Sequence, residues 1–301
     1  MIRLSLLLLL FSFALEAQKK SDKKKNIPRG FEWVKKRGMV VSQFEITASQ
    51  WVEFLQSLDV KDLATNTPQS NAINDKCVCQ NSLNGELVIK DVNETVFRDT
   101  TYYEANESPP AGGTGKKGKK RKAVENCSSM PITGITIDQA QSFCNWLTDK
   151  YSRDDLYAEL ELNFRLPTPQ EMETLLQDTF ADWKPEEDNY QAYQRGLNSH
   201  GCAIYNHYHN SWCDNNLNMK FRYGYKVPMQ VGLFFPDMNG LYDLMGNVAE
   251  LTSENGIAKG GSCIDPASEC QPNAVKSYNG PQPWLGFRVV AELSDFNSKY
   301  K

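Results

Sequence analysis

The stretch from Asn239 to Ser262 carries the residue types in this chain best suited to chemistry. Gly246 and Asn247 form a step that tolerates left-handed backbone, so a tight turn is expected there. Glu250 and Glu254 follow this turn four residues apart. Carboxylate and amide oxygens gathered on a turn are ligands that calcium prefers. The competing interpretation is a turn-rich core segment in which Asn247 bonds its own backbone.

A second candidate site is the window that holds all three histidines. It contains His200-x-Cys202 and His207-x-His209, with Cys213 at its end. Imidazole and thiolate groups at this spacing are able to ligate zinc or copper. The expected ligands of such a metal are His207 and His209. The competing interpretation is an exposed loop closed by a disulfide.

The chain contains eight cysteines, which allow 105 pairings. In an exported chain this number indicates an oxidising compartment and some disulfides. Two pairs would each close a short loop, Cys202 with Cys213 and Cys263 with Cys270. Cys144 falls on a predicted helix face, where a buried thiol is the simpler interpretation.

The first residues resemble an export signal. A positive residue, Arg3, precedes an apolar run from Leu4 to Leu15, and Ala17 is a small residue suited to cleavage. We therefore expect a signal peptide over 1–17 and a basic disordered lead-in over 18–30. The apolar run is short for a bilayer span, and no later run is long enough, so no transmembrane segment is expected after cleavage. The expected location is the periplasm, the outer membrane or the extracellular space.

Composition excludes some partners and favours others. The net charge of −4 gives no reason to expect a nucleic-acid partner. Aromatic residues make up 11% of the chain, so a globular core with polar handles is expected. An aromatic set around the histidines would suit a groove for a peptide or a glycan, although ordinary packing under long loops explains it equally. The set comprises Trp183, Tyr190, Tyr193, Tyr205, Tyr208, Trp212 and Tyr223 to Tyr225.

The segment from about 61 to 126 interrupts the regular pattern. It contains the tract Gly112–Lys122, which concentrates positive charge on a glycine-rich backbone. Such tracts bury too little apolar surface to order themselves, which favours a flexible surface loop. Binding of an anionic polymer is the sharper alternative.

Three capping boxes predict three helices that begin at Thr47, Thr136 and Thr168. Apolar residues recur at helical spacing after each box, so each helix should bury one face. Short strands are expected at Met39–Val41, Phe44–Ile46, Pro131–Ile135 and Asn163–Leu166, with a strand pair at Leu87–Ile89 and Thr95–Phe97.

Six motifs follow one another in the order of a single family. They are FEITASQW from Phe44, PITGITIDQAQSFCNWL from Pro131, RLPTPQE from Arg165, GLYDLMGNVAE from Gly240, KGGS from Lys259 and LGFR from Leu285. The chain resembles the formylglycine-generating enzyme (sulfatase-modifying factor) family. The resemblance covers 31–292, with the insertion at about 61–126, and leaves 293–301 as a tail.

The resemblance implies an α+β fold, an irregular and loop-rich domain of the C-type-lectin-like kind. It also implies a structural calcium ion at the Gly-Asn turn, where Asn247, Val248 and Glu250 would contribute oxygens. In both respects it strengthens the first reading of the Asn239–Ser262 stretch.

The resemblance places the family's copper centre just after Ser262. Catalytic members carry two cysteines five apart, beginning three residues after that serine. Here Asp265 stands at the first position and Cys270 near the second, and a carboxylate is a poor ligand for Cu(I). Cys270 is the candidate catalytic residue and Cys263 a weaker one. A disulfide between them is favoured over copper-dependent oxidation.

The function implied by the resemblance is a non-catalytic one. Relatives without the oxidase centre serve as cell-envelope components of gliding or secretion type, so a binding or scaffolding role with an envelope protein or peptide is expected. A copper-dependent oxidase that converts a peptide cysteine to formylglycine is the first alternative. A glycan-binding or adhesion module is the second.

Overall fold

The computed structural model describes residues 27–69, 78–80, 87–89, 96–104, 120–125, 127–181, 187–209, 212–215, 219–222 and 226–293. The predicted signal peptide, most of the basic lead-in and nearly all of the predicted tail lie outside these residues. So do most of the Gly112–Lys122 tract and Cys77.

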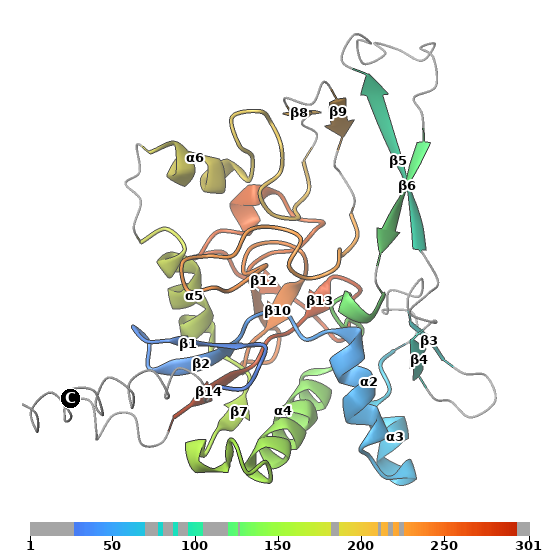
Figure 1. Ribbon diagram of the computed structural model, residues 1–301, viewed down its shortest axis with the longest axis vertical. Coiled ribbons are helices and arrows are strands. Elements are labelled where there is room, and N and C mark those ends of the chain that lie inside the picture. The colour runs from blue at the N-terminus through green and yellow to red at the C-terminus, as the bar shows by residue number, and fades with distance from the viewer. Residues whose placement is uncertain are drawn as a thin grey trace, which may run out of the picture.

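The fold is α+β, with short strands and long connections between them (Figure 1). Its helices are α2 Ala48–Gln56, α3 Val60–Asn66, α4 Ile137–Ser152, α5 Pro169–Asp178 and α6 Asp188–Arg195, with 3₁₀ turns at η1 Cys127–Ser129, η2 Ala158–Leu160 and η3 Ala267–Glu269.

Two four-stranded sheets form the body of the domain. The first has the order β1 (Phe31–Val34), β2 (Met39–Ser42), β14 (Val290–Glu292) and β7 (Asn163–Arg165), all antiparallel. The second has the order β12 (Lys276–Ser277), β11 (Ile257–Lys259), β10 (Ala249–Leu251) and β13 (Leu285–Gly286). Because β14 lies between β2 and β7, the two ends of the domain are joined in one sheet.

Further strands come mainly from the predicted insertion. β3 (Val78–Gln80) pairs with β4 (Leu87–Ile89), and β5 (Val96–Glu104) pairs with both β6 (Lys120–Glu125) and β9 (Met219–Arg222). β8 (Trp212–Asn215) pairs with β9 and completes a four-stranded sheet of order β6, β5, β9 and β8. The β5–β6 hairpin stands at one side of the body, on the right of the view (Figure 1).

The three predicted capping boxes are confirmed at the starts of α2, α4 and α5. In each box the threonine hydroxyl accepts a hydrogen bond from the backbone N–H of the glutamine or glutamate three residues later. The side chain of that glutamine or glutamate in turn accepts a hydrogen bond from the backbone N–H of the threonine. Both bonds use donors that a helix start leaves unpaired, which is why the sequence predicts these starts well.

The main core lies between α2, α4 and the strand ends. Trp51 of α2 stacks on Phe143 of α4 with ring centroids 5.6 Å apart, and Phe287 meets both rings edge-on. Phe54 and Trp146 extend this aromatic cluster. Rings of this size supply much of the buried apolar area that holds the helices on the sheets.

A second core cluster lies behind α5. It joins Met172, Leu175 and Leu176 of that helix to β1, β2 and the residues around Leu244. Lys259 of β11 is buried beside this helix, where it donates to the Pro272 carbonyl at 2.8 Å and pairs with Glu173 at 3.3 Å. The second cluster therefore joins α5 to the first sheet, and Lys259 joins it to the second.

Some predicted strands are absent or paired differently. Phe44–Ile46 and Pro131–Ile135 are extended segments, joined to each other where Ile132 N donates to Ile46 O, and only Pro131 forms an isolated bridge, with Thr47. Leu87–Ile89 forms a strand, but with β3 rather than with the strand that contains Val96. Alternation alone does not specify which of several nearby strands becomes the partner.

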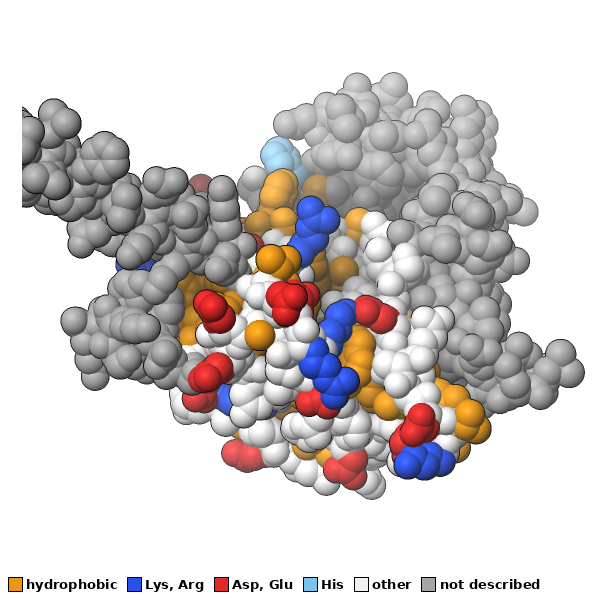
Figure 2. All heavy atoms as spheres, turned by 60° about the horizontal axis from the view of Figure 1, so that its bottom comes forward, with side chains coloured by type: hydrophobic (Ala, Val, Ile, Leu, Met, Phe, Trp, Pro, Cys, Tyr) orange, Lys and Arg blue, Asp and Glu red, His pale blue; other side chains and the backbone are white. Residues whose placement is uncertain are grey.

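The face shown in Figure 2 carries acidic and basic side chains close together, with apolar side chains between them. This mixture offers no field of a single charge sign. Within the described parts of the chain, no helix has both the length and the apolar character to cross a bilayer.

Candidate functional site

The predicted Gly-Asn turn is present and tightly held. Gly246 and Asn247 both adopt left-handed backbone, with φ of 76° and 57°. A Cβ atom on Gly246 would lie 2.3 Å from the Asn206 carbonyl oxygen, so this position requires glycine. Asn247 N donates to that same carbonyl at 2.7 Å, and Cys263 N donates to the Asn247 carbonyl at 3.0 Å. The turn is thus clamped between the segments around Asn206 and Cys263.

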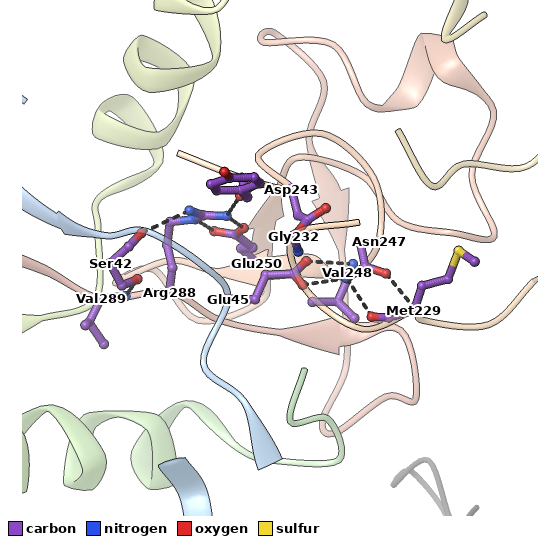
Figure 3. A network of polar contacts seen from close by, with 11 residues as sticks. Ser42, Glu45, Met229, Gly232, Asp243, Asn247, Val248, Glu250, Arg288 and Val289 are labelled. Atoms are coloured by element: carbon purple, nitrogen blue, oxygen red, sulfur yellow. Dashed lines mark hydrogen bonds and ion pairs between the residues drawn. The ribbon is translucent and has the colours of Figure 1, made fainter. Parts of the chain in front are cut away.

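The side chain of Asn247 uses all of its hydrogen-bonding capacity within the protein. Its amide nitrogen donates to Glu45 Oε2 at 2.6 Å and to the Met229 carbonyl at 3.2 Å. Its oxygen accepts from Met229 N at 2.8 Å and from Asn206 Nδ2 at 3.0 Å. Figure 3 shows this amide between the Glu45 carboxylate and the Met229 backbone.

Glu250 is equally engaged, with Arg288. Two guanidinium nitrogens of Arg288 donate to the two Glu250 oxygens at 2.6 Å each, and both side chains are fully buried. Arg288 also donates to the carbonyls of Ser42 at 3.2 Å and Tyr242 at 2.9 Å. This bidentate pair joins β10 to the C-terminal segment and to the end of β2 (Figure 3).

Two further buried carboxylates complete this polar network. Glu45 accepts from Val248 N at 3.1 Å, and Asp243 accepts from Gly232 N at 2.7 Å. Burial, with the nearby charges of Asp243 and Glu250, raises the pKa of Glu45 well above its ordinary value. Burial likewise raises the pKa of Asp243 to about 6. Glu45, Asp243 and Glu250 share one guanidinium, that of Arg288. Ionising all three carboxyl groups in a water-free interior would cost free energy, which is why their pKa values rise.

The side-chain oxygens of two predicted calcium ligands are already bound by protein donors in this arrangement. Both Glu250 oxygens accept from Arg288, and the Asn247 oxygen accepts two N–H groups. Among the described residues, no group of three or more His, Cys, Asp or Glu side chains is placed to hold a metal. Asn247, Val248 and Glu250 instead hold distant segments together.

The predicted disulfide between Cys263 and Cys270 is not formed. Both side chains are buried and outside any disulfide, as is that of Cys144. The Cys270 thiol points back into its own turn, toward the Pro266 carbonyl at 3.7 Å, and its sulfur packs against Gly261. Cys263 is fixed separately by its backbone bond to the Gly-Asn turn, so each cysteine is oriented by a different contact.

Cys202, by contrast, is disulfide-bonded. The side chain of Cys213 lies outside the described part of the structure. The Cys202–Cys213 pairing therefore stays a prediction.

The first cysteine position of the family's copper centre is occupied by an engaged carboxylate. Asp265 accepts from the Ser262 hydroxyl at 2.6 Å and pairs with Lys276. The Lys276 ammonium also lies 4.1 Å from the Trp284 ring centroid. Burial raises the pKa of the Cys270 thiol well above its ordinary value. A carboxylate held in this way is a poor ligand for Cu(I), which prefers thiolates.

His207 and His209 are buried, so the exposed-loop interpretation is wrong for them. Their ring centroids are 5.0 Å apart, and His207 Nδ1 lies 3.0 Å from the Tyr205 carbonyl. Burial lowers the pKa of His207, and burial with the neighbouring His207 lowers that of His209 to about 4. The pair is neutral near pH 7 and packs beside Tyr205. His200, the third histidine, lies exposed on the same loop.

The residues missing from the sequence-based prediction are Glu45, Asp243 and Arg288. Glu45 lies about 200 positions from its partner Asn247, and Arg288 lies 38 from Glu250. Each belongs to one of the six motifs, but spacing along the chain gives no sign that their side chains meet.

Comparisons with known proteins agree with this architecture. The family model for the sulfatase-modifying factor enzyme 1-like domain matches residues 12–293, most of the chain. The chain therefore belongs to this family of formylglycine-generating-enzyme-like proteins. No curated protein matches it significantly.

Several solved structures are similar at low identity. PvdO from Pseudomonas aeruginosa shares 15% identity at a TM-score of 0.44, over 85% of this chain and 80% of its own. CarF shares 15% identity at a TM-score of 0.44, and the match covers 85% of this chain and 87% of CarF. Treponema denticola variable protein 1 shares 18% identity at a TM-score of 0.37, and the match covers 62% of this chain and 76% of that protein. Family membership therefore stands on the family model.

Proposed function

We propose that this protein is a non-catalytic member of its family, exported to the bacterial cell envelope, where it binds or scaffolds another protein. The observation that carries the proposal is Asp265. Its carboxylate occupies the position of a copper-binding thiolate and is engaged by Ser262 and Lys276. The engaged side chain supports a structural role for this position.

The remaining thiols support the same proposal. Cys263 and Cys270 are fully buried, and the raised pKa of Cys270 keeps its thiol protonated near neutral pH. Since the thiolate is the form that binds metal and attacks oxidants, a buried thiol of this kind is inert. A protein whose loops are fixed by buried polar pairs is well suited to present a binding surface.

A copper-dependent oxidase is the second candidate, and one observation favours it. Cys263 and Cys270 are both reduced, and they are close enough for each to influence the other's charge. Cysteines outside a disulfide carry the soft sulfur ligands that Cu(I) prefers.

Titration with Cu(I), followed by incubation with a cysteine-containing sulfatase peptide in air, separates the two functions. We expect no formylglycine product by mass spectrometry from the native chain or from Cys270→Ser. Product formed by the native chain and lost in Cys270→Ser would overturn the non-catalytic proposal. The variant Asp265→Cys, which places a thiol at the family's first position, is the positive comparison for restored copper binding.

Export and the envelope partner need separate tests. The mature N-terminus, read by mass spectrometry after expression with a secretion pathway, should begin at Gln18. A crosslinking experiment in intact cells should then recover an envelope protein with the native chain. A chain that keeps residues 1–17 and stays in the cytoplasm would contradict the export part. Recovery of polysaccharide without protein would favour the glycan-binding alternative.

A further inference from the structure

A pocket opens between α5, α6 and the loop that precedes the Gly-Asn turn. Thr179 at the end of α5 and Tyr193 of α6 line it, together with Ile204 and Tyr205. The remaining lining residues are Phe234, Phe235, Asp237, Leu241, Asp243, Leu244 and Met245. Neither Arg288 nor the histidine pair lines it, and Asp243 is the residue that the pocket shares with the polar network.

Thr179 is an unexplained polar group at this pocket. The residue is only 4% exposed, and its hydroxyl oxygen has no hydrogen-bond partner. A buried hydroxyl without a partner costs free energy, so such groups are few in folded proteins. A ligand with a polar atom at the inner end of the pocket would supply the missing bond.

The charge of the lining is negative. Asp237 and Asp243 line the pocket, and no Lys, Arg or His does so among the described residues. Asp243 accepts from Gly232 N through Oδ2, and no described residue donates to its Oδ1. The donors of nearby Arg288 are committed to Glu250, Ser42 and Tyr242. A ligand that carries a positive charge therefore meets carboxylate oxygens and no cation among the described lining residues. The charge of Arg288 acts on both carboxylates from outside the lining and reduces, without removing, their attraction for such a ligand.

The rim of the pocket is apolar and exposed. We call Leu233–Met238 the 233–238 loop. Phe235 is 89% exposed, Met238 63% and Leu233 47%, and these three make up half of the large exposed hydrophobic side chains among the described residues. The other three are scattered singly, at Val60, Leu156 and Val275. Three such side chains within six residues mark a surface that a partner covers.

We propose that this pocket binds a lysine or arginine side chain of a partner protein, whose neighbouring apolar residues pack on the 233–238 loop. The cation pairs with Asp243 and Asp237, its polar hydrogens satisfy the Thr179 hydroxyl, and its alkyl stem lies along Phe234 and Tyr193. The negative lining selects the cation, and the exposed rim selects a peptide over a free amine. This inference rests on the proposed binding role and names the chemistry of the partner.

The test uses the full chain and two acetylated, amidated tripeptides, Leu-Lys-Leu and Leu-Gln-Leu, titrated by calorimetry. We expect the lysine peptide to bind about tenfold or more tightly than the glutamine peptide, because the glutamine side chain is shorter and carries no charge. Equal binding of the two, or binding of neither, would overturn the proposal. Butylammonium that binds as tightly as the lysine peptide would also overturn it, since the peptide rim would then contribute nothing.

Matched variants separate binding from folding. Thr179→Val keeps the shape and removes the unpaired hydroxyl, so binding should weaken by about three- to tenfold while the melting temperature stays the same or rises. Asp243→Asn should weaken binding of the lysine peptide about tenfold or more, and the exposed control Asp155→Asn should leave it unchanged. Unchanged binding in both Thr179→Val and Asp243→Asn would refute the site.

The rim has its own control. Phe235→Ser should reduce binding, and Leu156→Ser, at an exposed apolar residue that does not line the pocket, should not. Equal effects of the two would exclude the 233–238 loop from the site. Failure here is distinct from failure of the non-catalytic proposal, which depends on formylglycine product alone.

Discussion

At the scale of single residues, Arg288 is the partner that engages Glu250, the carboxylate that follows the Gly-Asn turn. Its guanidinium binds both oxygens of Glu250 and two backbone carbonyls while fully buried. A buried ion pair of this kind adds less net stability than its geometry suggests, because both charges have lost their water. Removing only one of the two charged side chains is costly, because the other charge then stays buried without a partner.

Arg288→Met should therefore lower the free energy of unfolding by about 3–5 kcal/mol, measured by urea denaturation. The double variant Arg288→Met with Glu250→Leu should recover part of that loss, because no charge is then stranded. Arg153→Met is the control, since Arg153 pairs with Asp149 at the surface, and it should cost less than about 0.5 kcal/mol. A loss below about 1 kcal/mol in Arg288→Met would show that Glu250 is relieved by protonation or water.

Asp243 gives the protein a pH-dependent stability. The unfolded carboxyl ionises near 3.8, and burial raises the pKa of the folded one to about 6. Between these values the folded state keeps a proton that the unfolded state has lost, so stability from this group falls as pH rises from about 4 to about 6. At about 1.4 kcal/mol for each pKa unit, the fall amounts to about 3 kcal/mol.

Asp243→Asn should remove this fall, because an amide does not titrate and still accepts the bond from Gly232 N. Urea unfolding at pH 4 and pH 7 measures the difference for each chain. Asp155→Asn, at an exposed site, should keep the native difference. The assignment fails if the native chain and Asp243→Asn lose the same stability over this interval.

At the scale of elements, the sequence predicts what depends on neighbours along the chain. The starts of α2, α4 and α5 follow from threonine and a glutamine or glutamate three residues on, and the buried faces follow from apolar spacing. Pairing between distant segments does not follow. Phe44–Ile46 alternates like a strand, yet it is extended so that Glu45 faces Asn247.

The same limit applies to the candidate site. The left-handed turn at Gly246 and Asn247 was predictable, because those residue types tolerate that backbone. The partners of the Asn247 side chain come from Glu45, Asn206 and Met229, and no local pattern specifies them. The turn is confirmed, and the calcium ion at it stays a prediction.

Gly246 and Gly280 test what this turn requires. Both have positive φ, 76° and 74°, but a Cβ on Gly246 would meet the Asn206 carbonyl at 2.3 Å, whereas one on Gly280 would meet nothing within 4 Å. Gly280→Ala should cost about 1–2 kcal/mol from backbone strain alone. Gly246→Ala should cost clearly more, about 3 kcal/mol or above, because the backbone must also move. Equal thermal unfolding midpoints for the two variants would show that the turn yields freely.

At the scale of the whole molecule, buried polar pairs take the place of regular structure. The network of Glu45, Asn247, Glu250 and Arg288 joins the N-terminal segment, the central turn and the C-terminal segment (Figure 3). β14 makes the same connection through the sheet, between β2 and β7. These contacts hold together long loops that are distant in the sequence.

This construction leads to a prediction about calcium for the protein as a whole. Because the oxygens of Asn247 and Glu250 are bound by protein donors, the melting temperature should be the same within about 1 °C in excess chelator and in millimolar calcium. An ion held at 100 times its dissociation constant would instead add about 2.7 kcal/mol. Magnesium at the same concentration controls for ionic strength. A calcium-specific rise would mean that the turn exchanges its protein donors for the ion, and that Arg288 gives up Glu250 when the ion binds.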